Sequence, residues 1–110
     1  MTPATAALFD AIGDPTRRAM VSLMARGPAS VSALADPLGI TVTAVGQHLR
    51  VLEHAGLASS EKRGRTRFCR IRPEGLAAIE DWARHVRREW DGRLDRLGEV
   101  LDANEIDPAD

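Results

Sequence analysis

The segment of residues 30–57 constrains the fold most strongly, because its sequence predicts two short helices joined by a tight turn. The first helix, VSALADPL, can be capped by Ser30 or Ser32, and the proline near its end requires it to stop there. A glycine then permits the turn, and Thr41 can cap a longer helix over about residues 42–54. Two helices in this arrangement predict a helix-turn-helix.

The second helix has one apolar face and one polar face. Val45, Leu49 and Leu52 recur at spacings of four and three, whereas Gln47 and Arg50 face away from them. In a helix-turn-helix the second helix lies in the major groove of DNA, where its first residues meet base edges. We therefore predict DNA contacts from Thr41, Val42, Thr43, Gly46, Gln47, His48 and Arg50.

Gln47 is the best candidate for reading sequence, because a carboxamide can pair bidentately with adenine. The alternative is that Gln47 only solvates an exposed helix face. For His48 we weigh a packed or phosphate-facing side chain against a catalytic one, and favour the former. Arg17 and Arg18, near the start of an earlier helix, either contact phosphates or brace Asp14 and the domain interior.

A basic β-hairpin is predicted directly after the helix-turn-helix. The segment LASSEKRGRTRFCRI has turn residues at Arg63-Gly64 between strand-competent runs, and residues 61–72 hold six Lys/Arg against one acidic residue. Arginines at a hairpin tip can grip phosphates or enter the minor groove, although a charge run is commonly only a solvated face. The position beside a helix-turn-helix favours DNA, so we predict contacts from Arg63, Arg65 and Arg67 in a wing of residues 61–70.

Three further helices are predicted around this unit. The first covers about residues 4–12 and the last about residues 74–102. The second begins at Pro15, with Asp14 as its N-cap. The last helix carries an apolar stripe that one small domain cannot cover, which predicts pairing with a second copy. The predicted dimer-interface residues are Leu8, Phe9, Ile79, Trp82, Val86, Trp90, Leu94 and Leu97. The fold class is thus mostly α, with about five helices and a two-stranded wing.

Length and charge narrow the function further. The 110 residues fit one domain, in which about residues 14–72 would bind DNA, and they offer no pairing of nucleophile and base for catalysis. Residues 1–72 hold 10 Lys/Arg and 5 Asp/Glu, whereas the remainder holds 5 and 11, so that one half suits an anionic partner. No apolar run could span a membrane and no secretory signal is evident, so we expect a cytoplasmic protein ending in a short acidic tail.

The chain resembles the ArsR-type winged-helix regulators over about residues 6–72. The resemblance rests on FDAIGDPTRRAMVSLM, on ALADPLGITVTAVGQHLRVLEHAGL and on KRGRTRF in the hairpin. It implies a homodimer that pairs through its first and last helices and represses genes by occupying an operator in double-stranded DNA. Gly46 stands where the family often has serine, and this departure puts one family contact with DNA in doubt.

The family's metal sites do not carry over. One family site uses cysteines on the first helix of the helix-turn-helix, which here has none, and another uses an Asp-x-His pair on the last helix, which here has only His85. We therefore predict no metal and no cofactor, and an effector, if one exists, that is a small molecule or a protein. Cys69 fits a buried free thiol. The alternatives are a metal- or redox-responsive repressor using Cys69, and a winged helix used for protein contacts, against which the basic wing argues.

Overall fold

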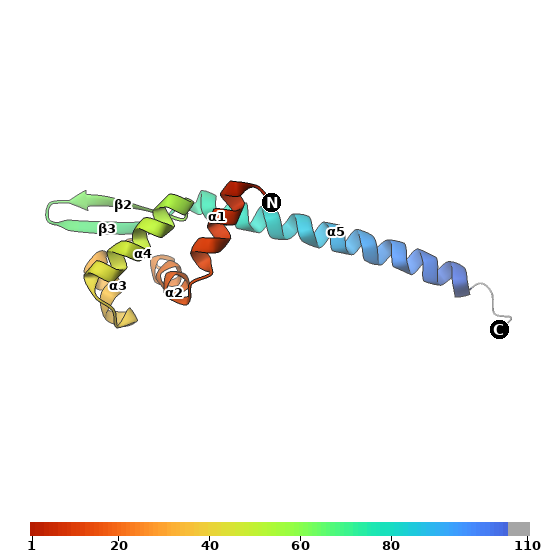
Figure 1. The fold of residues 1–110 in the computed structure, drawn as a ribbon, viewed down its shortest axis with the longest axis horizontal. Coiled ribbons are helices and arrows are strands. Elements are labelled where there is room, and N and C mark those ends of the chain that lie inside the picture. Colours follow the sequence, from red (N-terminus) through yellow and green to blue (C-terminus); the bar gives the residue numbers. More distant parts are fainter. Residues whose placement is uncertain (106–110) are drawn as a thin grey trace. The chain divides into compact units, whose positions relative to one another are not determined.

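The structure, a computed structural model, describes residues 1–105, and the end of the predicted acidic tail, residues 106–110, lies outside the described residues. Five helices and three strands follow one another along the chain (Figure 1). In chain order they are α1 (Pro3–Ile12), α2 (Pro15–Met24), β1 (Ala29–Ser30), α3 (Val31–Leu38), α4 (Val42–Ala55), β2 (Ala58–Arg63), β3 (Thr66–Ile71) and α5 (Pro73–Glu105). The predicted winged helix-turn-helix is confirmed, with α3 and α4 as its two helices.

The helix starts follow the predicted caps. The side chains of Asp14, Ser30 and Thr41 each accept a backbone N–H from the residue three positions later, which satisfies one of the free donors of the first turn. Of the two candidate serines, Ser30 is therefore the cap of α3. The turn after α3 uses Gly39 at φ +65°, a left-handed conformation that other residues rarely adopt.

The chain forms two units, of which the first comprises residues 1–79. Within it α4 packs against α1, α2, α3 and β2. The core consists of Leu8, Ala11, Met20, Met24, Leu34, Ala35, Val45, Leu49, Leu52, Leu57, Ala58 and Cys69. Residues from every helix of this unit except α5 are fully buried in one cluster, so the position of α4 is fixed from several sides.

The sheet has three antiparallel strands in the order β1-β3-β2, one more than the two-stranded wing that we predicted. The additional strand pairs Ala29 with Cys69 and Ser30 with Phe68. Two residues are too few to show an alternating pattern, and for this reason the sequence did not reveal β1.

The hairpin turn lies one residue later than the predicted Arg63-Gly64. Arg63 pairs with Thr66 as the last residues of the two strands, so the loop is Gly64-Arg65. Gly64 has φ +64°, and a glycine at the first loop position is typical of a tight two-residue hairpin turn.

The second unit begins at Glu80, and its described part is the remainder of α5. Its large apolar side chains are exposed, with Trp90 60% and Leu97 52% accessible to solvent. Val86, Trp90, Leu94, Leu97 and Leu101 follow at spacings of four and three, which places them on one helix face. None of the described helices is long and apolar enough to cross a membrane.

The first turn of α5 touches the end of α4 through two glycines. The Arg72 N–H donates to the Leu57 carbonyl oxygen at 2.9 Å. A Cβ on Gly75 would collide with the carbonyl oxygen of Gly56 and lie 3.1 Å from the Leu57 Cα, both of which are backbone atoms. Only a residue without a side chain fits at this crossing.

We expect Gly75→Ala to lower the free energy of unfolding by about 1–3 kcal/mol, because the backbone at Gly56 must shift to make room. Gly46→Ala is the matched control, since Gly46 is also helical but an added Cβ there meets nothing within 4 Å. That variant should instead gain up to about 1 kcal/mol of helix propensity. Denaturant unfolding at equal protein concentration measures both, and effects of the same sign would contradict this account of Gly75.

Candidate nucleic-acid interface

The outer face of α4 is polar and open to solvent. Thr43, Gln47 and Arg50 lie on it, opposite the buried Val45 and Leu49. Gln47 and Arg50 make no hydrogen bond or ion pair to any described residue, so their polar groups are available to a ligand. This is the arrangement that a helix reading base edges requires.

The N-terminal end of α4 offers fewer free groups. The Thr41 hydroxyl oxygen accepts the Ala44 N–H at 3.0 Å, so it already serves the helix cap. Val42 is 52% exposed and presents its methyl groups. At Gly46 the space beside the helix is open, so packing within the chain does not explain the glycine.

The wing arginines divide into paired and unpaired side chains. Arg63 lies 3.5 Å from Glu61, and Arg67 donates to the Ser60 hydroxyl at 2.9 Å. Arg65, in the hairpin loop, is exposed and has no partner among the described residues. Of the three predicted wing contacts, Arg65 is therefore the one without a partner among the described residues. Lys62, which was not among the predicted contacts, has none there either.

A hydrogen-bonded chain joins the wing to α4. Arg67 donates to Ser60, and the Ser60 hydroxyl donates in turn to the Glu53 carboxylate at 3.2 Å. The register pairs Ser60 with Cys69, which faces the core, so this chain lies on the helix side of the hairpin. Sequence reasoning missed it, because Glu53 and Ser60 carry no motif.

Arg17 and Arg18 brace the turn between α1 and α2. Arg17 Nε donates to the Ala11 carbonyl oxygen at 2.6 Å, and Arg18 donates to the carbonyl oxygen of Ile12 at 2.7 Å. These carbonyls belong to the end of α1, where no helical N–H reaches them. Of the two alternatives weighed for these arginines, the structure therefore shows the bracing role.

Asp14 begins α2 beside these arginines. Its carboxylate accepts the Arg17 N–H at 2.9 Å, and this hydrogen bond holds the pKa of Asp14 below its usual value. A lowered pKa means that ionised Asp14 stabilises the fold fully above the usual carboxyl range. That contribution is lost as the pH falls through the lowered pKa.

The His48 side chain extends from one side of α4 toward the turn between α1 and α2. Its Nδ1 lies 3.4 Å from Arg17 Nη1 and 3.9 Å from an Asp14 carboxylate oxygen. The side chain is 26% exposed. His48 is thus packed on one side and open on the other.

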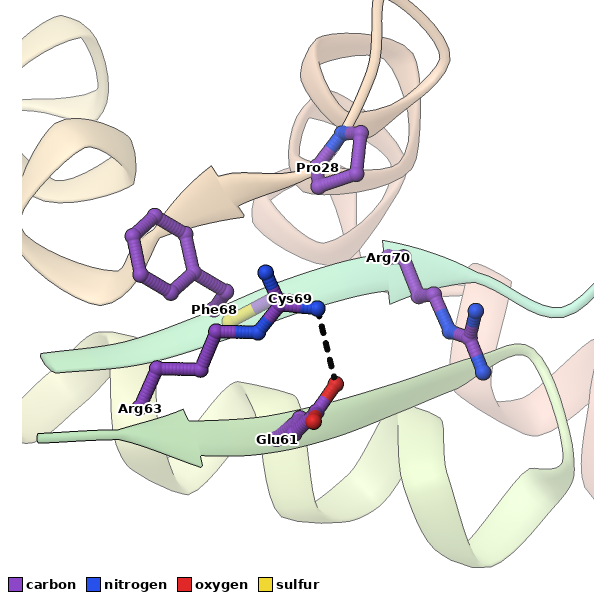
Figure 2. A pocket seen from close by; sticks show the side chains of 6 residues that line it. All are labelled: Pro28, Glu61, Arg63, Phe68, Cys69 and Arg70. Atoms are coloured by element: carbon purple, nitrogen blue, oxygen red, sulfur yellow. Dashed lines mark hydrogen bonds and ion pairs between the residues drawn. The ribbon is translucent and has the colours of Figure 1, made fainter.

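A cavity of about 300 Å³ lies along the strands of the wing (Figure 2). Its lining consists of Pro28, Glu61, Arg63, Phe68, Cys69 and Arg70. Cys69 is fully buried, and burial, followed by the charge of Glu53, raises the pKa of its thiol. Among the described residues, no group of three or more His, Cys, Asp or Glu side chains stands together as a metal site would require.

The predicted dimer residues fall into three groups. Leu8 is only 4% exposed and belongs to the core, so it offers no surface to a partner. Phe9, Ile79 and Trp82 are partly buried. Val86, Trp90, Leu94 and Leu97 are exposed.

Comparisons with known proteins agree with this architecture. A family described as "Helix-turn-helix domain" matches residues 12–61. The chain is 36% identical over 95 residues to the HTH-type transcriptional regulator Rv2034 of Mycobacterium tuberculosis, a match that covers 86% of each chain.

Two solved structures are similar over most of the chain. An ArsR family transcriptional regulator aligns with a TM-score of 0.76 at 36% identity, covering 83% of this chain and 95% of that one. The homodimeric winged helix-turn-helix DNA-binding domain of a possible ArsR-family regulator from Mycobacterium bovis aligns with a TM-score of 0.64 at 26% identity, covering 78% and 80%. The fold, the basic wing and these relatives show that the chain belongs to the ArsR family of helix-turn-helix transcriptional regulators.

Proposed function

We propose that this regulator is a homodimeric repressor that binds a palindromic operator, with α4 in the major groove and the wing on the flanking backbone. The observation that carries the proposal is the set of exposed, unpartnered polar side chains on α4 and the hairpin. Gln47 and Arg50 on the helix and Arg65 in the hairpin loop have no partner among the described residues. Base edges and phosphates supply the acceptors and donors that such groups lack.

Helix and wing have different tasks in this proposal. Gln47 reads a base, and Arg65 neutralises a phosphate or enters the minor groove. Thr43 and Arg50 add contacts along the same helix face, and Val42 meets a thymine methyl group. Arg67 holds the wing through its hydrogen bond to the neutral Ser60 hydroxyl, and its charge adds to that of Arg65.

Dimerisation is supported by the exposed face of α5. Val86, Trp90, Leu94 and Leu97 are all large, apolar and at least 41% exposed. A second copy would remove this surface from water, and the related domain from Mycobacterium bovis is described as homodimeric. A palindromic operator has half-sites about 34 Å apart in successive major grooves, which suits a dimer that carries one recognition helix in each copy.

The direct test of the proposal is recovery of genomic DNA fragments that bind the purified protein. A shared inverted repeat among the recovered fragments is expected, and enhanced transcription from such promoters in cells lacking the protein would establish repression. Fragments without a common sequence would contradict operator binding.

Gln47→Ala should weaken the operator complex by about 1–3 kcal/mol and leave binding to random DNA nearly unchanged, because a base contact carries sequence information. Arg65→Ala should weaken both and reduce the slope of log K against log salt by about 0.9 per lost phosphate contact, or about 1.8 in a dimer. Binding titrations at several salt concentrations measure both quantities.

Each of these variants is the control for the other, and thermal melting checks that both are folded. Equal losses on operator and random DNA for Gln47→Ala would show that it does not read a base. An unchanged salt slope for Arg65→Ala would remove the wing from the phosphate contacts.

Trp90→Glu should convert the dimer into monomers, because it places a charge in the centre of the exposed apolar stripe. Arg88→Glu introduces the same side chain on the opposite face of α5 and should leave the dimer intact. Sedimentation at micromolar concentration distinguishes the two results. A dimer that survives Trp90→Glu would place the interface elsewhere.

Cys69 should resist alkylation in the native protein at neutral pH. Its thiol is fully buried and its pKa is raised, so both access and the thiolate fraction are low. Labelling with and without denaturant gives the comparison, and fast labelling of the native protein would favour the redox-responsive alternative.

A further inference from the structure

The contact between Arg17 and His48 joins the α1–α2 turn to the recognition helix. Arg17 Nη1 lies 3.4 Å from His48 Nδ1, although the two residues are 31 positions apart. The guanidinium is held in place independently, because its Nε donates to the Ala11 carbonyl oxygen at 2.6 Å and its Nη2 to the Asp10 carbonyl oxygen at 3.3 Å. His48 therefore meets a fixed cation.

In the neutral ring of His48, this contact favours a proton on one ring nitrogen over the other. A guanidinium has only donors and keeps its charge at any ordinary pH, so the nitrogen that faces it must act as an acceptor. Nδ1 is that nitrogen, and a neutral imidazole with a bare Nδ1 carries its hydrogen on Nε2. The Asp14 carboxylate, at 3.9 Å from Nδ1, is too distant to receive a hydrogen bond from it.

Nε2 is open to solvent. It has no hydrogen bond to any described residue, and no side-chain nitrogen or oxygen sealed from solvent lacks a partner in the described structure. An unpartnered Nε2 therefore reaches the surface. His48 presents one N–H donor outward beside the face that carries Gln47.

The position of His48 on α4 selects the kind of DNA group that it meets. At 100° per residue, His48 lies about 100° around the helix from Gln47, between the outward face and the buried stripe. When the outward face points at the floor of the groove, a side chain on the flank points at its wall, where the phosphates are.

We propose that Arg17 fixes His48 as the Nε2–H tautomer and that His48 donates this hydrogen to a DNA phosphate. The proposal rests on the DNA-binding function proposed above. Arg17 is then a positioning residue, which acts on DNA only through His48. Because the donor is neutral, the contact contributes affinity without displacing counterions from the DNA.

Replacement of His48 by the two amides tests the donor. The amide nitrogen of glutamine reaches about where Nε2 lies, whereas that of asparagine lies near Nδ1. His48→Gln should stay within about threefold of the parent on operator and random DNA, and His48→Asn should lose about tenfold on both. The salt slope should stay unchanged in both variants.

Two outcomes of this comparison overturn the phosphate contact. Equal affinity of the two folded amide variants would show that no Nε2 donor is needed. A salt slope reduced by about 0.9 per subunit in His48→Asn would show a charged imidazolium on the phosphate in place of the neutral ring.

Arg17→Met and Arg18→Met test the positioning role as a matched pair. Both remove hydrogen bonds to the last carbonyls of α1, but only Arg17 touches His48. The ring ¹⁵N shifts of His48 in the DNA-free protein at neutral pH should show an Nε2–H tautomer in the parent and in Arg18→Met, and a mixture in Arg17→Met. Operator affinity should fall more in Arg17→Met than in Arg18→Met.

The NMR result does not depend on DNA, which separates this inference from the proposed function. If the parent shows His48 with its hydrogen on Nδ1, or with both nitrogens protonated, Arg17 does not fix the Nε2–H tautomer, even if the protein binds the operator. If the parent binds no DNA, the proposed function fails and the phosphate contact fails with it. Equal ¹⁵N patterns in both methionine variants would show that Arg17 has no role beyond bracing the turn.

Discussion

The burial of one face of α4 is the constraint on which the rest of the structure depends. Val45, Leu49 and Leu52 are at most 2% exposed, and they contact a core drawn from α1, α2, α3 and the sheet. Complete burial of such side chains contributes roughly 1.5–3 kcal/mol each. Because the apolar stripe can face only the core, the opposite stripe with Gln47 and Arg50 must face solvent. Burial of one face of α4 is therefore enough to expose the other.

Rotation and tilt of α4 are restrained by polar contacts on its two flanks. On one flank His48 meets Arg17 and Asp14, and on the other Glu53 accepts from Ser60, which accepts from Arg67. Contacts of this kind near the surface contribute little to the total stability, but they have defined directions that apolar packing lacks. The basic residues therefore divide into those whose hydrogen bonds position the helix and wing and those without a partner among the described residues.

The local features were predictable from sequence and the long-range ones were not. Thr41 as a cap and Gly39 in the turn are visible in a few adjacent residues, because capping and left-handed φ are local requirements. Strand β1 escaped prediction because two residues show no period. Leu8 is buried by residues that are distant in the sequence, so its place in an apolar pattern could not show whether it faces the core or a partner. Arg67 is paired with Ser60, which carries no motif, so the run of basic residues could not reveal that pairing.

The net charge of −1 conceals how the chain presents its charge to an anionic partner. At physiological ionic strength, exposed charges separated by more than about 8 Å are largely screened from each other. The part of α5 from Glu80 to Glu105 extends over about 39 Å at 1.5 Å per residue, so most of its carboxylates lie beyond one screening length from any single point. An acidic excess spread along such a helix cannot cancel six Lys/Arg gathered within residues 61–72. The chain thus keeps a near-neutral total charge while a duplex that approaches the wing meets a strongly positive surface, and a duplex that approaches the acidic helix does not.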